Sequence, residues 1–199
     1  MTENLVHKHA EHEEQSNDRL MFGFWVYLMT DLLMFGVLFA VYAVLHNNNV
    51  GGPSDKELFK LPLALTGTLL LLTSSFTCGL GMIGARKGSV KQVLSWFSVT
   101  FLLGLAFLGL ELFEFTQLIH EGHTMSANAF LSSFFVLVGT HGLHIISGLL
   151  WLLVILIYVV KRGLTPSMVR KLGYLSLFWH FLDVVWIFIF TVVYLKAFV

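Results

Sequence analysis

Long hydrophobic runs, separated by short polar connections, dominate the sequence. Five runs are long enough to cross a bilayer as helices, since about 20 apolar residues span its hydrocarbon core. They cover, approximately, residues 20–45, 61–85, 93–118, 129–160 and 172–198. The pattern predicts an all-α fold, an integral membrane bundle of five transmembrane helices. The bundle forms one domain over residues 20–199, preceded by a polar, histidine-rich tail over residues 1–19.

The composition agrees with a membrane protein. Hydrophobic residues make up 56% of the chain and charged residues 12%, whereas soluble domains carry about 25% charged residues. Lys and Arg balance Asp and Glu at 12 each, so the charge gives no reason to expect a nucleic-acid partner. The single cysteine, Cys78, excludes a disulfide or a site of several thiolates within this chain.

The N-terminal tail carries three histidines, His7, His9 and His12, among glutamates. Imidazole suits zinc or copper, so a metal site is one interpretation. A polar segment of this kind is more typical of a solvated, disordered tail, and we favour that interpretation.

The basic residues are distributed unevenly between the two sides of the predicted membrane domain. Five spans put the termini on opposite sides. Three cations fall on the C-terminal side: Lys56, Lys60 and Lys196. Nine fall on the N-terminal side: Lys8, Arg19, Arg86, Lys87, Lys91, Lys161, Arg162, Arg170 and Lys171. Because basic loops stay in the cytoplasm, we predict a cytoplasmic N-terminus.

Seven ionisable side chains fall inside the spans, where a charge costs about 2.5–3.5 kcal/mol on insertion scales. They are Asp31, Glu111, Glu114, His141, His144, His180 and Asp183. Six form pairs three residues apart, and each such pair shares a helix face. The set is either a proton path or ion site, or an intramembrane polar network that fixes helix packing. We favour packing for Glu111 and the last pair, and leave both interpretations open for Asp31 and Glu114.

Two other functional classes use the same residues. A membrane b-haem anchor would take one histidine from each of two helices, such as His144 and His180. A proton-coupled transporter would use Asp31, Glu114 and the histidines. The sequence shows no internal repeat, which argues against a transporter built from inverted repeats. The pairs also lack the Glu-x-x-His pattern of di-iron bundles.

Small and aromatic residues predict close helix contacts, because small side chains let helices approach in lipid. On the second span these are Ser75, Thr77, Gly79, Gly81 and Gly84, and on the fourth Gly139, Gly142, Ser147 and Gly148. Trp179 and Trp186 lie seven residues apart and share a face of the last span. Tryptophans also anchor helices at membrane interfaces.

Two segments are specific enough to identify a family. Gly139-Thr-His-Gly-Leu-His-Ile-Ile-Ser-Gly148 and Phe178-Trp-His-Phe-Leu-Asp-Val-Val-Trp186 resemble the signature segments of subunit III of haem–copper terminal oxidases. Asp31, within Gly23-Phe-Trp-Val-Tyr-Leu-Met-Thr-Asp31, stands at that family's mid-membrane acid, and Glu114, within Leu110-Glu-Leu-Phe-Glu-Phe115, at its second acidic position. The resemblance runs from about residue 20 to the C-terminus.

Four further features resemble subunit III of bacterial cytochrome o (bo-type) ubiquinol oxidases. They are the five-helix length, the histidine-rich tail, Gly51-Gly-Pro53 and Arg162-Gly-Leu-Thr165. Mitochondrial-type subunits III carry two more N-terminal helices, which form one arm of a lipid-holding cleft. The resemblance also has a departure, because Asp31 stands where cytochrome c oxidases have a carbodiimide-reactive Glu.

The resemblance implies an accessory subunit in the bacterial inner membrane, with a periplasmic C-terminus. Its complex would oxidise ubiquinol, reduce oxygen to water and pump protons. The haems and copper would lie in subunit I, and this chain would have no catalytic, cofactor-binding or metal-binding residue. Subunit I would be its main contact, with subunits II and IV in the same complex and phospholipid held at the interface. We expect the chain to support assembly and stability, and Asp31 to face the bundle and hydrogen-bond to the fourth or fifth span.

Overall fold

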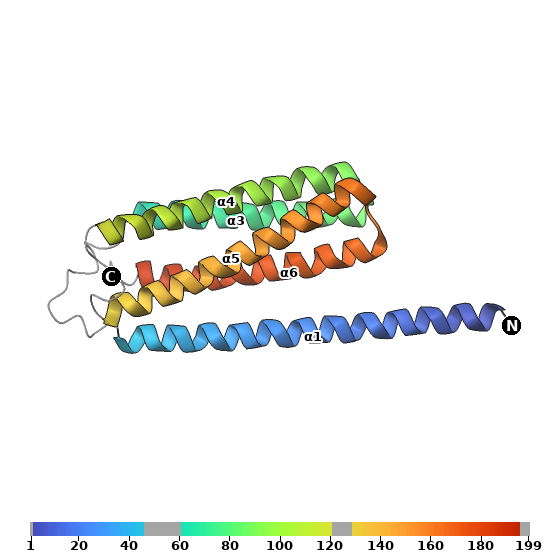
Figure 1. The fold of residues 1–199 in the computed structure, drawn as a ribbon, viewed down its shortest axis with the longest axis horizontal. Helices are drawn as coiled ribbons and strands as arrows, with labels where there is room; N and C mark the ends of the chain where they lie inside the picture. The colour runs from blue at the N-terminus through green and yellow to red at the C-terminus, as the bar shows by residue number, and fades with distance from the viewer. Residues whose placement is uncertain (1, 46–60, 121–128, 196–199) are drawn as a thin grey trace. The chain divides into compact units, whose positions relative to one another are not determined.

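A computed structural model describes residues 2–45, 61–120 and 129–195, with side chains from residue 18 onward. All described elements are helical. They are α1 (Thr2–Leu45), α3 (Leu61–Arg86), α4 (Val90–His120), α5 (Ala129–Arg162), α6 (Pro166–Ile189) and the π-helical turn η1 (Phe190–Leu195). Figure 1 shows their course along the chain.

The chain divides into two compact units, Met1–Gly36 and Val37–Val199, and helix α1 runs from the first into the second. The second unit contains the last part of α1 and a bundle of α3, α4, α5 and α6 (Figure 1). Each of these four helices packs against two others, in the cyclic order α3, α4, α5, α6. The helices therefore enclose an interior into which all four project side chains.

The five predicted spans are confirmed among the described residues. The helices long and apolar enough to cross a membrane are Asp18–Leu45, Leu61–Arg86, Val90–His120, Ala129–Arg162 and Pro166–Leu195. The apolar runs located the spans, because in lipid the backbone groups must be satisfied within the helix.

The last helix begins earlier than predicted, at Pro166 rather than residue 172. Thr165 caps its N-terminus, because the Thr165 side chain accepts a hydrogen bond from the backbone N–H of Met168. Proline suits the first helical turn, where its missing N–H costs nothing. Only a short bend remains between α5 and α6, and Gly163 turns it with φ of +74°. Basic residues predicted to lie in a loop, Arg170 and Lys171, are therefore helical.

The polar tail also differs from the favoured prediction of disorder, because helix α1 begins at Thr2. Its glutamate, glutamine, alanine and lysine residues are good helix formers. Extending an existing helix is also much easier than nucleating a new one, and the first span supplies that helix. The side chains of the tail histidines lie outside the described residues, so a metal site there stays untested.

The predicted close contacts hold at most of the small residues. At Gly148 a Cβ atom would lie 3.2 Å from the rings of Phe178 and Trp179, so α5 approaches α6 closely at that point. Gly81 likewise faces the ring of Phe97. Gly79 and Ser147 are exceptions. Nothing lies within 4 Å of the Gly79 Cβ position, and Ser147 is exposed.

Trp179 and Trp186 are packing residues rather than interfacial anchors. Both are buried in the second unit. Their indole N–H groups donate to hydroxyls of α3, to Ser74 and Thr68 respectively, each at 3.0 Å. The predicted shared face of the last span is thus the face that binds α3.

Candidate functional site

An acidic cluster lies where α4 meets η1 and comprises Glu111, Glu114 and Tyr194. All three side chains are buried, and Tyr194 is completely inaccessible. The Tyr194 hydroxyl donates a hydrogen bond to Oε2 of Glu114 at 2.9 Å. Burial of a polar group is tolerable when it is hydrogen-bonded, so this bond explains how Glu114 can lie inside the bundle.

Glu111 lies one helical turn before Glu114 and packs directly on the backbone of α5. A Cβ atom at Gly142 would lie 3.0 Å from Oε2 of Glu111. Gly142 is therefore the position on α5 that leaves room for this carboxyl. Neither oxygen of Glu111 has a hydrogen-bond partner among the described residues. Glu111 is as deeply buried as Glu114.

A small cavity of about 10 Å³ adjoins the two glutamates. Its walls come from α3, α4 and α6, and they are Leu63, Ala64, Gly67, Phe107, Leu110, Glu111, Glu114 and Trp186. That volume is about what one water molecule requires. The two acidic side chains are the only ionisable groups in this lining.

His141 joins the cluster through aromatic contacts. Its ring is completely buried and stacks on Trp186, with ring centroids 5.4 Å apart. Phe107 meets His141 and Trp186 edge-on, at centroid distances of 6.0 and 4.7 Å. The histidine thus lies in the same aromatic layer as the cavity wall.

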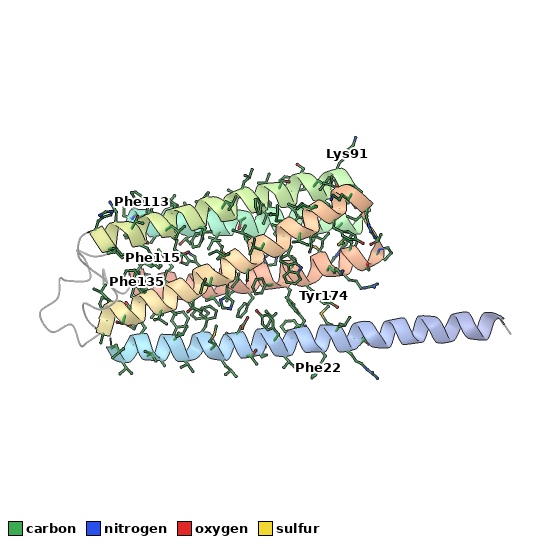
Figure 2. All side chains as sticks on the ribbon, viewed as in Figure 1. Phe22, Lys91, Phe113, Phe115, Phe135 and Tyr174 are labelled. Atoms are coloured by element: carbon green, nitrogen blue, oxygen red, sulfur yellow. The ribbon has the colours of Figure 1, made fainter. Side chains whose placement is uncertain are left out.

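The π-helical turn η1 places Tyr194 in this cluster. Isolated π-helical turns within α-helices are uncommon and often occur at functional sites. The wider turn changes the phase of the last helix, and Tyr194 then lies 6.1 Å from the ring of Trp186. Figure 2 shows the neighbouring aromatic layer between α4 and α5, where Phe115 meets Phe135 at a centroid distance of 5.0 Å.

A second group, the histidine cluster, comprises Ser75 of α3 with His180 and Asp183 of α6. The Ser75 hydroxyl and Nδ1 of His180 are hydrogen-bonded at 2.5 Å. The same hydroxyl also lies close enough to the Asp183 carboxylate to interact with it. Ser75 and Asp183 are buried, whereas His180 is half-buried. One serine therefore ties both ionisable residues of α6 to α3.

The predicted polar network is thus two clusters rather than one. The described hydrogen bond of His144 links it to neither cluster. Its Nδ1 pairs with the Thr140 carbonyl oxygen of its own helix at 2.7 Å. Asp31 lies in the other compact unit, where it is hydrogen-bonded to Tyr27. Its expected bond to the fourth or fifth span therefore stays a prediction.

Sequence reasoning missed two features that organise these clusters. It did not single out Tyr194, and it did not predict that Ser75 forms hydrogen bonds. A signal for Tyr194 was present, because a tyrosine deep in an apolar span needs a partner for its hydroxyl. Ser75 was interpreted only as a small residue. Its contact with the last span depends on how the helices pack and is not encoded in the local sequence.

The described residues contain no group of three or more His, Cys, Asp or Glu side chains placed to hold a metal ion. Aromatic rings occupy the contact between α5 and α6 near His144, one of the two histidines that a haem would need. Phe178 lies 6.5 Å from the ring of His144, and Phe178 and Trp179 both press on Gly148.

Comparison with known proteins identifies the family. A family model described as "Cytochrome c oxidase subunit III" matches residues 3–198. The chain is 54% identical to "Cytochrome bo(3) ubiquinol oxidase subunit 3" of Pseudomonas aeruginosa over 191 residues, 96% of this chain and 91% of that protein.

Further relatives differ in the name of their oxidase. "Quinol oxidase subunit 3" of Bacillus subtilis is 48% identical over 94% of this chain and 92% of its own length. "Cytochrome c oxidase subunit 3" of Bacillus sp. PS3 is also 48% identical, over 89% of this chain and 86% of its own length. With a match over nearly its whole length, this chain belongs to the cytochrome c oxidase subunit III family.

Proposed function

We propose that this chain is the accessory subunit III of a haem–copper ubiquinol oxidase of an aerobic respiratory chain. The observation that carries the proposal is the match of residues 3–198 to the subunit III family, together with 54% identity to a subunit named for ubiquinol oxidation. The complex is an oxidoreductase, and this subunit is not itself catalytic. The five membrane-spanning helices agree with a multi-pass subunit.

The redox centres belong, in this proposal, to another subunit. The rings of Phe178 and Trp179 fill the α5–α6 contact beside His144. This arrangement supports helix packing, rather than haem binding, as the role of that contact. An absorption spectrum of the isolated chain separates the two uses. A haem band in the isolated chain would favour the b-haem anchor.

The partners would be the other oxidase subunits, with subunit I as the main contact and phospholipid at the interface. The outward faces of the helices carry large apolar side chains, such as Phe113 on α4 (Figure 2). Such faces suit either lipid or another membrane helix. Cross-linking within the purified complex would identify which helices touch subunit I.

The proposed location is the bacterial inner membrane, with the N-terminus in the cytoplasm and the C-terminus in the periplasm. The excess of Lys and Arg on the N-terminal side supports this orientation. The two ends of α4 provide a test in intact cells. A membrane-impermeant thiol reagent should label His120→Cys but not Ser89→Cys, and the reverse pattern would overturn the orientation.

Ubiquinol as the electron donor rests on the names of the relatives and not on chain length. The relative named as a cytochrome c oxidase subunit is matched over 86% of its own length, so it is similarly short. The five-helix length, which we took as a mark of the quinol-oxidase branch, therefore does not separate the two donors.

Purification of the tagged full-length chain in mild detergent tests the whole proposal. We expect it to bring down a complex that contains haem and copper, oxidises ubiquinol and reduces oxygen. Removal of the chain should leave the haem content largely intact but weaken assembly or sustained turnover. Isolation of the chain alone, with transport activity in liposomes, would instead favour the proton-coupled transporter.

A further inference from the structure

The carboxyl group of Glu111 is unusual because it is deeply buried and lacks a hydrogen-bond partner among the described residues. Only 5% of the residue is exposed, and both of its oxygens are unpartnered there. Buried polar groups without partners are rare and are commonly served by internal water. The cavity of about 10 Å³ that Glu111 lines supplies room for one such molecule.

The surroundings of the cavity decide what it would hold. Its α3 wall is apolar, formed by Leu63, Ala64 and Gly67. Glu114 lines it from α4, and the indole N–H of Trp186 is engaged with Thr68. Internal waters make about two to four hydrogen bonds. The oxygens of the two glutamates provide the polar groups that a water at this point would need.

No described cation lies near the two acids along the chain. The Lys and Arg residues with described side chains lie near the ends of α3, α4 and α5, in the first turns of α6 and, for one of them, within α1: Arg86, Lys87, Lys91, Lys161, Arg162, Arg170, Lys171 and Arg19. The titratable groups around the acids are Tyr194 from η1, His141 from α5 and Tyr42 from the last part of α1, which lies within electrostatic reach of Tyr194. The two glutamates are themselves close enough to interact electrostatically. Two adjacent buried carboxylates cannot both stay ionised without a counter-charge.

We infer that Glu111 and Glu114 form a binding site for one internal water molecule and hold at least one exchangeable proton between them at membrane depth. The water donates to one carboxyl and accepts from the protonated one. Tyr194 fixes Glu114 by donating to its Oε2, and Gly142 gives Glu111 its space on α5. The inference goes beyond the proposed function, because it concerns only groups of this chain.

Infrared spectroscopy of the purified complex tests the shared proton. A protonated carboxyl has a C=O stretching band that moves on transfer to D₂O. We expect Glu111→Gln and Glu114→Gln each to remove or shift the same band, because the two groups share the proton. Tyr194→Phe should shift the band without removing it. Unchanged carboxyl bands in both glutamine variants would overturn the inference.

A second pair of variants keeps both acids and tests the water. Ala64→Val adds bulk to the cavity wall. Its matched control is Ala85→Val on the same helix, equally buried and about 30 Å away along the helix axis. We expect only Ala64→Val to move the carboxyl band to the higher frequency of a less hydrogen-bonded group and to slow its exchange in D₂O.

Two outcomes would contradict the site. Identical carboxyl bands in Ala64→Val and the wild type would show that no water at the cavity serves the acids. Ionised carboxylate bands that respond to added Na⁺ or Mg²⁺, with no protonated band, would show that a cation occupies the site instead. If a glutamine variant fails to assemble into the complex, the comparison of Ala64→Val with Ala85→Val still tests the site.

Discussion

The acidic cluster and the histidine cluster solve the same problem in different ways. Both place ionisable side chains inside the bundle of the second unit. All three side chains of the acidic cluster are buried, and Tyr194 in it is completely buried. The histidine cluster is more open, because His180 is half-buried at the surface of the bundle.

This difference in burial teaches what each cluster can be used for. A buried site must satisfy its polar atoms internally. The acidic cluster has a tyrosine for this purpose and, by our inference, one water molecule in the adjoining cavity. The polar atoms of a more exposed site can also form hydrogen bonds with lipid headgroups, water or a neighbouring subunit. The histidine cluster relies internally on Ser75 alone. We therefore expect substitutions in the acidic cluster to cost more stability.

The largest effect should come from Gly142→Val, which pushes a side chain into the carboxyl of Glu111. The Cβ atom alone would lie 3.0 Å from Oε2. Overpacking of this kind costs about 2–3 kcal/mol. Titration of the purified complex with SDS would measure the loss in free energy of unfolding. Gly139→Val is the control on the same helix, since its nearest neighbour is 3.9 Å away, and equal losses in both would refute the close contact.

The next largest effect should come from Tyr194→Phe, which removes the hydrogen bond to Glu114 and leaves a buried acceptor. An unsatisfied buried acceptor costs about 1–3 kcal/mol, and we expect about 1–2 kcal/mol in the same titration. Tyr158→Phe is the matched control, because Tyr158 is exposed and its hydroxyl accepts only a long hydrogen bond from Arg162. A Tyr194→Phe protein as stable as the control would mean that the bond contributes nothing.

The histidine cluster should respond less to Ser75→Ala. This substitution removes the serine link between α3 and α6. Hydrogen bonds between membrane helices contribute on average about 0.6 kcal/mol and at most about 1.7 kcal/mol, so we expect a loss near 1 kcal/mol. Ser147→Ala is the control, since Ser147 is exposed and bonds only to its own helix. A loss larger than that of Tyr194→Phe would reverse the ranking of the two clusters.

The fold was predictable where physics acts locally along the chain. Hydropathy located all five spans, because length and apolarity decide whether a helix can cross a bilayer. The start of α6 was missed by six residues, although Thr165 and Pro166 form a recognisable capping sequence. Polar residues there lie outside the hydrophobic window yet continue the helix.

The clusters were predictable only in part, because their partners are distant in sequence. The pair Glu111 and Glu114 was visible from spacing alone. Tyr194 lies 80 residues beyond Glu114 and reaches it through a π-helical turn that no local pattern indicated. Ser75 lies 105 residues before His180. Spacing predicts which residues share a helix face, whereas the register between helices depends on the packing of the whole bundle.

The smallest effect, and the sharpest distinction between the clusters, should come from Asp183→Asn. Oδ1 of Asp183 has no hydrogen-bond partner among the described residues, while the carboxylate lies within interaction distance of Ser75. Asparagine keeps an oxygen that can accept from Ser75 and removes a partly buried charge, so two effects of opposite sign offset each other. We expect the free energy of unfolding to change by less than about 0.5 kcal/mol. Asp183→Leu is the control that also deletes the acceptor, and it should cost more. A large loss in Asp183→Asn would show instead that attraction between charged His180 and Asp183 holds this cluster together, in contrast to the hydrogen-bonded acidic cluster.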